Sequence, residues 1–253
     1  MEEDQSFLFL MDKLFPFSYV KWCADPSNID FEDCSPFEGF LTGDFLHLVM
    51  KAIWVRSNVL FPKGMWKFLS EVCDQLTSAS LDTYIVHVVG LCQIVADITT
   101  DIHDRFISVF SLVTSIAALA SRKCFDFYQL TPNILEVFYN MALKGEFYKQ
   151  DGWKGLERFL QNIEYAKWYN KLRSITSTVK NVSFSEEFLE CTQLKNLTLE
   201  NDPLSIILEK ICDDAVLDIT RIVISTVEPS LWKKLNGFDS EEKATSNSDD
   251  SES

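Results

Sequence analysis

The sequence lacks the cysteine and histidine spacings that hold metal ions or build disulfide frameworks. Its seven cysteines are scattered singly without a CxxC pair, and its three histidines, His47, His87 and His103, stand far apart. Neither a zinc site nor a set of disulfides is therefore expected, and we interpret the thiols as single, mostly buried groups in a reducing compartment. The sequence predicts no metal and no cofactor.

Positive charge is also scarce. Lys and Arg number 23 against 38 Asp and Glu, the net charge is −15, and no Lys/Arg run is longer than a pair. Binding to a phosphate backbone depends on such cations, so nucleic acid is excluded as an expected partner. The first residues, MEED, are acidic where a secretory signal needs basic ones. We expect a cytoplasmic protein.

The motifs of common enzyme classes are absent as well. There is no glycine-rich phosphate loop, no GxSxG turn and no HExxH helix. An enzyme is therefore not expected. A site assembled from distant residues is the enzymatic alternative that stays open, and it would show itself through a polar pocket with strongly perturbed carboxylates or histidines.

The most informative stretch present is Phe106 to Ala120, an uncharged run enclosed by Asp104-Arg105 and Arg122-Lys123. At about 1.5 Å per residue the run is too short for a bilayer core of about 30 Å. It predicts a helix that is apolar on every side and buried by other helices. The expected fold class is all-α, a helical bundle around this central helix with extra helices at the C-terminus.

Hydrophobic periodicity of the helical type predicts the surrounding elements. The expected ranges are 44–56, 65–76, 81–98, 133–144 and 154–169. Thr131-Pro132 is interpreted as the start of the fourth of these helices, Gly145 as its end or bend, and Asp151-Gly152-Trp153 as a tight turn before the fifth.

The domain organisation expected from composition has four parts. Residues 1–41 form an aromatic-rich extension that should pack on the domain or on a partner, and residues 42–173 form the bundle. Residues 174–238 form a helical C-terminal extension, with helices expected over 185–194 and 204–227. The acidic tail, 239–253, is polar and without aromatics, so we expect it to be disordered.

A short pattern in the second predicted helix resembles a ligand for an apolar groove. It has the form Leu-x-x-apolar-small-Asp-x-apolar and places its apolar residues on one stripe with an aspartate beside them. A partner arginine could reach this aspartate. The motif consists of Met65, Leu69, Val72, Asp74 and Leu76.

The order of the pieces resembles the B-cell-lymphoma (Bcl) family of apoptosis regulators. Met65–Leu76 is similar to the third homology motif of that family, Asp104–Phe110 to the first and Lys149–Phe159 to the second. The separation between Arg105 and Trp153 is also close to that of the family. The resemblance covers about residues 42–169 and leaves both ends of the chain unexplained.

The resemblance implies a groove that accepts amphipathic helices of other proteins. Arg105 would be its polar anchor, and Gly152 and Trp153 would form a structural turn at the end of the central hairpin. The family usually has Asn-Trp-Gly before the arginine, whereas this chain has Ile102-His103-Asp104. An aspartate beside Arg105 is able to pair with it. The implied groove residues are Val72, Leu76, Val88, Leu91, Val95, Arg105, Phe106, Val109 and Phe110.

The C-terminal part offers no stable transmembrane anchor, because Ile219–Val227 is short and contains Arg221. Residues 204–215 repeat the groove-ligand pattern. Two interpretations stay open for this repeat. It is an ordinary amphipathic helix, or it occupies the protein's own groove and competes with outside ligands.

The function expected from the resemblance is non-enzymatic regulation of apoptosis through binding of amphipathic death-motif helices. The alternative is an adaptor or scaffold built of stacked helical hairpins that binds partners through an acidic surface. Exposure of Phe106–Ala120 distinguishes the two, because a row of hairpins has no central hidden helix. The sequence leaves open self-association and whether the protein promotes or prevents cell death.

Overall fold

The computed structural model describes residues 4–23, 43–60, 80–122, 125–176, 209–227 and 229. All secondary structure in these ranges is helical, which confirms the expected all-α bundle. The elements along the chain are α1 (Gln5–Cys23), α2 (Gly43–Leu60), α4 (Leu81–Ile98), α5 (Ile102–Ser121), α6 (Phe125–Phe138), the π-helix η3 (Tyr139–Leu143), α7 (Lys144–Lys149), α8 (Gly152–Asn162), α9 (Tyr165–Thr176) and α12 (Asp214–Thr226).

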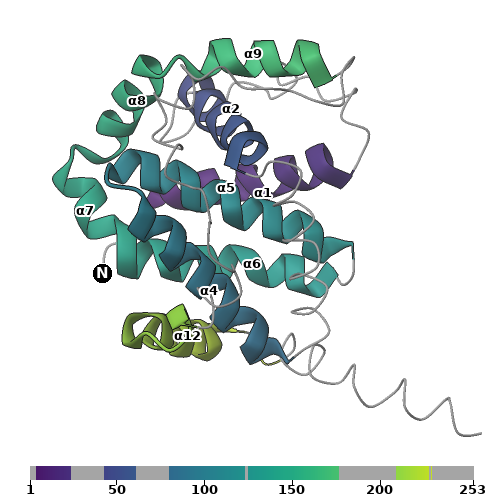
Figure 1. Cartoon of the computed structure of the whole chain (residues 1–253), viewed down its shortest axis with the longest axis vertical. Helices are drawn as coiled ribbons and strands as arrows, with labels where there is room; N and C mark the ends of the chain where they lie inside the picture. Colours follow the sequence, from purple (N-terminus) through teal and green to yellow (C-terminus); the bar gives the residue numbers. More distant parts are fainter. Residues whose placement is uncertain are drawn as a thin grey trace, which may run out of the picture.

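Helix α5 is the centre of the bundle (Figure 1). It contacts α1, α2, α4, α6, α7 and α8. Every residue of α5 except Arg105 and Ser121 is buried. The prediction of a buried apolar helix at this place is therefore confirmed.

The hydroxyl groups of α5 are satisfied inside the bundle. Ser111, Thr114 and Ser115 each donate a hydrogen bond to the backbone carbonyl four residues earlier, at 2.6, 2.8 and 2.7 Å. The Ser111 hydroxyl also lies 3.0 Å from the carbonyl oxygen of Ile53 in α2. Because these small side chains hydrogen-bond to the backbone of their own helix, α2 approaches α5 closely without leaving buried hydroxyls unsatisfied.

Helices α4 and α5 are both long and apolar enough to cross a membrane by length and composition. Helix α5 is longer than the uncharged run in the sequence because it begins four residues before Phe106, at Ile102, after the N-cap Asp101. Within the bundle, 56% of the apolar window of α4 and 94% of that of α5 are buried. Buried helices of soluble proteins have the same properties.

The predicted helix start at Thr131-Pro132 is wrong. Helix α6 begins at Phe125 and continues through Pro132, and η3 follows it directly. Thr131 is buried and donates its hydroxyl to the carbonyl of Phe127 at 2.6 Å. Phe127, Leu130 and Ile134 form one buried face. Burial of this face outweighs the cost of a proline within a helix.

The predicted single helix over 154–169 is also wrong, because α8 and α9 are separate. Glu164 has a φ of 55°, a left-handed conformation that ends α8. Leu160 and Tyr165 are both fully buried. A continuous helix would place them about 140° apart around its axis, so the break allows both to face the core. Gly145, expected to end or to bend a helix, does not end one, because it lies within α7.

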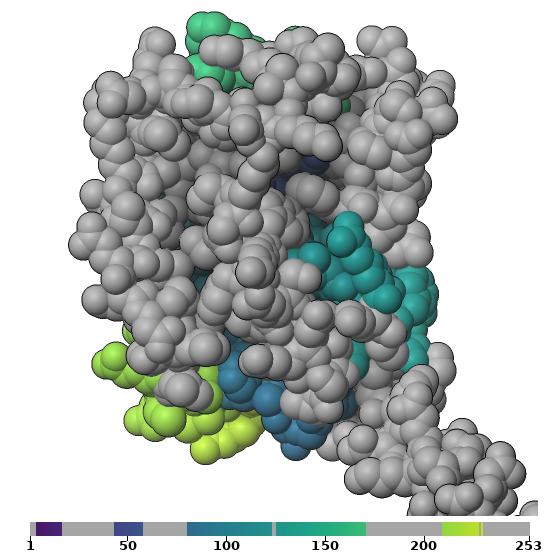
Figure 2. All heavy atoms as spheres, turned by 45° about the vertical axis from the view of Figure 1, so that its right-hand side comes forward, coloured from purple at the N-terminus to yellow at the C-terminus, as the bar shows by residue number. Residues whose placement is uncertain are grey.

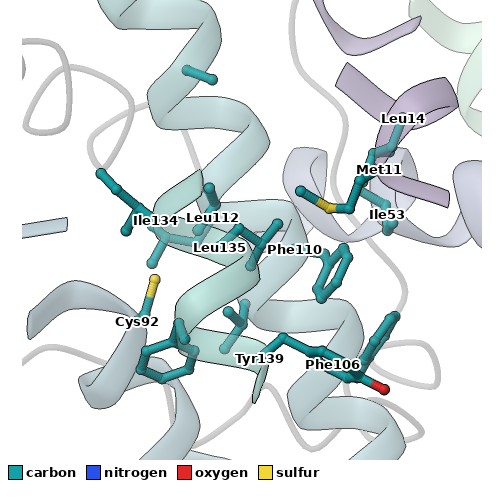
Figure 3. Close-up of a cluster of buried hydrophobic side chains, with 14 of the residues drawn as sticks. Met11, Leu14, Ile53, Cys92, Phe106, Phe110, Leu112, Ile134, Leu135 and Tyr139 are labelled. Carbon is teal, nitrogen blue, oxygen red and sulfur yellow. The ribbon is translucent and has the colours of Figure 1, made fainter. Parts of the chain in front are cut away.

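Both ends of the described chain pack on the bundle. Helix α1 contacts α5 and α2, and α12 contacts α4 and α6. Figure 3 shows Met11 and Leu14 of α1 near Ile53 of α2 and Phe110 of α5. Figure 2 shows α12 beside α4 on the surface of the molecule.

Candidate functional site

The first turn of α5 is fixed by a side-chain cap. The Asp101 carboxylate accepts hydrogen bonds from the backbone N–H groups of His103 and Asp104, at 2.8 and 3.0 Å. This cap satisfies two amides that have no partner within the helix. It also sets the rotation of the first turn, and therefore the directions in which Asp104 and Arg105 leave the helix.

Arg105 turns toward the end of α4 and toward α7. Its Nε and Nη2 atoms both donate to the carbonyl oxygen of Thr99, at 3.1 and 2.8 Å. Its Nη1 atom donates to Oε2 of Glu146 at 2.8 Å. The Arg105 side chain is 19% exposed and that of Glu146 is 43% exposed. The guanidinium is thus fixed in orientation, in a side chain that stays partly exposed.

Asp104 does not pair with Arg105. It forms a buried ion pair with Arg56 of α2, whose Nε atom also donates to Oγ of Ser108 at 3.1 Å. Successive residues of a helix point about 100° apart, so the two side chains leave α5 in different directions. Burial lowers the pKa of Arg56. Asp104 therefore links α5 to α2, and Arg105 pairs with Thr99 and Glu146 instead.

The residues that the resemblance assigned to a groove lie in two different environments. Val88, Leu91 and Val109 are buried in the core. Val95 is half-buried on α4, near the carboxyl end of that helix. Thr99 connects this part of α4 to Arg105, because its hydroxyl donates to the carbonyl of Val95 at 2.6 Å and its own carbonyl accepts from Arg105.

Phe106 and Phe110 belong to an aromatic cluster rather than to an open surface. Both are fully buried, and their rings stack at a centroid distance of 4.0 Å. Phe106 also stacks on Phe147 at 5.1 Å, and Phe7 of α1 meets Phe110 edge-on at 5.9 Å. Phe106 points about 100° away from Arg105 around α5. Helices α1 and α7 therefore cover this side of α5.

The predicted ligand-like motif over 65–76, together with the groove residues Val72 and Leu76, lies outside the described residues. The apolar residues at the carboxyl end of α4, which precede the Arg105 partner Thr99, are described. Ile94, Val95 and Ile98 are half-buried and lie within about 100° of one another around α4. We name Ile94, Val95, Ile98, Thr99 and Arg105 the α4–α5 corner.

The Gly-Trp turn joins α7 to α8. Asp151 and Gly152 adopt left-handed φ values of 65° and 52°. A Cβ atom at Gly152 would also lie 2.9 Å from the ring of Tyr148. The ring of Trp153 lies 5.3 Å from that of Phe147 and 5.7 Å from that of Phe106. The turn thus places the indole against the aromatic cluster around α5.

The Asp4 carboxylate connects the start of α1 to this turn. Its Oδ2 atom accepts from the hydroxyls of Tyr139 and Tyr148, each at 2.7 Å, and its Oδ1 atom from the indole N–H of Trp153 at 3.3 Å and the backbone N–H of Phe7 at 3.1 Å. Burial and the nearby Asp4 raise the pKa of Tyr148 to about 12 and also raise the pKa of Tyr139. We name this group the Asp4 clamp.

The repeat of the ligand-like pattern at 204–215 does not form one continuous helix in its described part. A turn over 211–213 separates residues 209–210 from α12. Asp213, the aspartate of the pattern, caps α12 by accepting from the backbone N–H of Ala215 at 3.0 Å. Its local role is therefore that of a helix cap.

This C-terminal segment packs on the side of α4 opposite Val88, about 40–60° around the helix from Ile94. Lys210 forms an ion pair with Asp97 at 2.6 Å, and a Cβ atom at Gly90 would lie 3.1 Å from Cγ2 of Ile211. Gly90 and Asp97 lie about 180–200° around α4 from Val88. The described contacts thus favour the first of the two interpretations, a helix packed on the bundle.

Metal-binding and nucleophilic groups do not gather in the described ranges. No group of three or more His, Cys, Asp or Glu side chains there is arranged to hold a metal ion. Cys92 is fully buried, and burial raises the pKa of its thiol far above the usual range. Burial likewise lowers the pKa of His103, whose ring lies among Phe147 and Phe159.

Comparisons of the chain with protein-family models, with curated proteins and with solved structures found no match.

The sequence did not identify three partners that define this region: Thr99, Glu146 and Asp4. Glu146 lies 41 positions from Arg105, and Asp4 lies 149 positions from Trp153. Such pairs depend on how the helices meet in space. The acidic N-terminal residues were visible in the sequence, but nothing in their spacing indicated contact with a distant tryptophan.

Proposed function

We propose that this chain is a non-enzymatic regulator of apoptosis that binds amphipathic helices of other proteins at the α4–α5 corner. An aspartate of the bound helix pairs with Arg105, and apolar side chains of that helix cover Ile94, Val95 and Ile98. The resemblance over residues 42–169 provides the class of partner. The observation that supports the site is the orientation of Arg105.

Arg105 is suited to such a role because its guanidinium is held before a ligand arrives. Three of its five N–H donors are used by Thr99 and Glu146, which leaves two among the described residues. A carboxylate can be held by two guanidinium N–H groups in a fixed geometry. The bound aspartate sets the register of the helix, while apolar burial supplies most of the affinity.

The enclosed position of α5 supports this class of function over the stacked-hairpin alternative. A row of hairpins would expose each helix similarly along the array, whereas Arg105 and Ser121 are the residues of α5 that escape burial. The acidic surface, on which the adaptor alternative depends, does not by itself specify a partner.

The test is a binding measurement by fluorescence anisotropy. The probe is a labelled helical peptide with the pattern Leu-x-x-apolar-small-Asp-x-apolar, compared with the same peptide carrying Ala in place of Asp. We expect Arg105→Ala to weaken binding of the Asp peptide about tenfold, since a charged hydrogen bond contributes about 1.5 kcal/mol or more. The Ala peptide should bind both proteins equally.

Arg221→Ala is the matched control, because Arg221 is 73% exposed on α12 and pairs with Asp218. It removes the same charge far along the chain from the α4–α5 corner. If Arg105→Ala binds the Asp peptide as well as the parent does, or if the parent binds neither peptide, the proposed function is wrong.

A further inference from the structure

We propose that Glu146 is an internal competitor for Arg105, and that its carboxylate holds the arginine until the aspartate of a bound helix replaces it. This inference rests on the proposed function and adds a residue that limits affinity at the same site. It starts from the one ion pair that Arg105 makes within the described residues, with Oε2 of Glu146 at 2.8 Å.

The two sides of the Arg105 guanidinium are held in different ways. On one side, Nε and Nη2 both donate to the carbonyl of Thr99, a backbone atom at the end of α4. The hydroxyl of Thr99 is bonded in turn to the carbonyl of Val95. The acceptor on this side is a backbone atom that cannot withdraw without movement of the end of α4, so it stays available to the guanidinium whether or not a ligand is bound.

The other side is held by a side chain that is able to leave. Glu146 lies on α7, and its side chain is 43% exposed. Arg105 is its charged partner within the described part of the chain. An exposed carboxylate that loses its partner regains water, so its departure costs little. The aspartate of an incoming helix would then take this Nη1 donor together with a neighbouring N–H that neither Thr99 nor Glu146 uses.

Of the carboxylates near Arg105, the local charges favour this role for Glu146 rather than for Asp104, which is adjacent to Arg105 on α5. Asp104 is closer along the chain, but it is held by Arg56 in a buried pair and is not available to Arg105. Asp101 is used by two backbone amides as the cap of α5. Glu146 is therefore the carboxylate that neutralises Arg105 and repels a second carboxylate approaching it.

The experiment uses the full chain and the same pair of labelled peptides. Glu146→Gln keeps the size of the side chain and removes its charge. We expect it to bind the Asp peptide about two- to fivefold more tightly than the parent does, which is the range for a partly exposed ion pair. The gain should shrink as salt is raised from 50 to about 300 mM, because exposed charges are screened. The Ala peptide should show no gain.

Glu157→Gln is the matched control, since it removes the same charge from α8, away from the contacts of Arg105. Equal affinities of Glu146→Gln and Glu157→Gln, or equal gains for the Asp and Ala peptides, overturn the competition by Glu146. In that case the proposed function stands if Arg105→Ala still weakens the Asp peptide. Absence of binding to the parent overturns both.

Discussion

At the scale of single residues, Gly155 is the most tightly enclosed of the described glycines. A Cβ atom there would clash with the carbonyl oxygen of Gln150 and lie 2.6 Å from Nε2 of His103. We expect Gly155→Ala to lower the free energy of unfolding by about 1–3 kcal/mol, because an added methyl group has to displace the backbone or a buried ring. Urea denaturation followed by circular dichroism measures this change.

Gly145 supplies the control for that substitution. It lies within α7, and a Cβ atom there meets nothing within 4 Å. Gly145→Ala should raise the free energy of unfolding by about 0.5–1 kcal/mol, through the lower backbone entropy of the unfolded chain. Equal effects of the two substitutions would contradict the close contact at Gly155.

The Asp4 clamp predicts a dependence of stability on alkaline pH. The pKa of Tyr148 is raised to about 12 in the folded protein, and the phenol titrates near 10 when unfolded. A raised folded pKa gives stability that is complete below about pH 10 and is lost as the pH rises toward 12. Tyr148→Phe should therefore flatten the decline of the urea midpoint between pH 9.5 and about 11.5.

The pKa of Tyr139 is also raised in the folded protein, so part of the decline of the urea midpoint should persist in Tyr148→Phe. The difference between the two curves isolates Tyr148. Superimposable curves for the parent and Tyr148→Phe would show that the phenol of Tyr148 does not depend on Asp4.

Single residues also show where reasoning from the sequence succeeds and where it ends. Arg105 and Trp153 could be singled out because the motifs around them resemble those of a known family. The partner of Asp104 could not be inferred, since Arg56 lies on another helix and only the rotation of both helices brings the pair together. An interaction between neighbours in sequence, Asp104 with Arg105, was the nearest expectation, and it is wrong.

At the scale of elements, one helix was predicted with both of its bounds. The range 81–98 matches α4, whose N-cap Ser80 accepts from the backbone N–H of Thr83 at 3.3 Å. The boundaries failed where tertiary packing overrides local signals. Pro132 lies within α6 because the residues before it form the same buried face as those after it. The break at Glu164 has no proline or glycine to mark it.

The packing of α12 on α4 can be tested through Gly90. A Cβ atom at this position would meet Ile211 at 3.1 Å, so the larger side chain in Gly90→Leu must displace the segment before α12. We expect backbone amides of α12 to exchange with deuterium at least tenfold faster, while those of α5 stay protected, because local opening needs less free energy than global unfolding.

Gly43→Leu is the control for Gly90→Leu, since a Cβ atom at Gly43 meets nothing within 4 Å. It should leave exchange in α12 unchanged. Unchanged exchange in Gly90→Leu would mean that Ile211 moves aside without loosening α12.

At the scale of the whole molecule, the enclosure of α5 by six other helices predicts a single slowest-exchanging element. Its amides should exchange through global unfolding, with a protection free energy equal to the free energy of unfolding from denaturation. Amides of α12 should exchange through smaller openings. Among the described helices, α12 has extensive contacts with α4 and α6 only. Equal protection of α5 and α12 would contradict this order.

The Asp4 clamp has a further consequence for how the chain matures during synthesis. Asp4 and Trp153 are 149 positions apart, and at about 5–20 residues per second the tryptophan emerges on the order of ten seconds later. Until then the ribosome presents a nascent segment whose phenylalanines have no aromatic cluster to join. Helix α1 is thus synthesised well before its partners in the clamp, and chaperones that recognise exposed apolar chain have that interval in which to act.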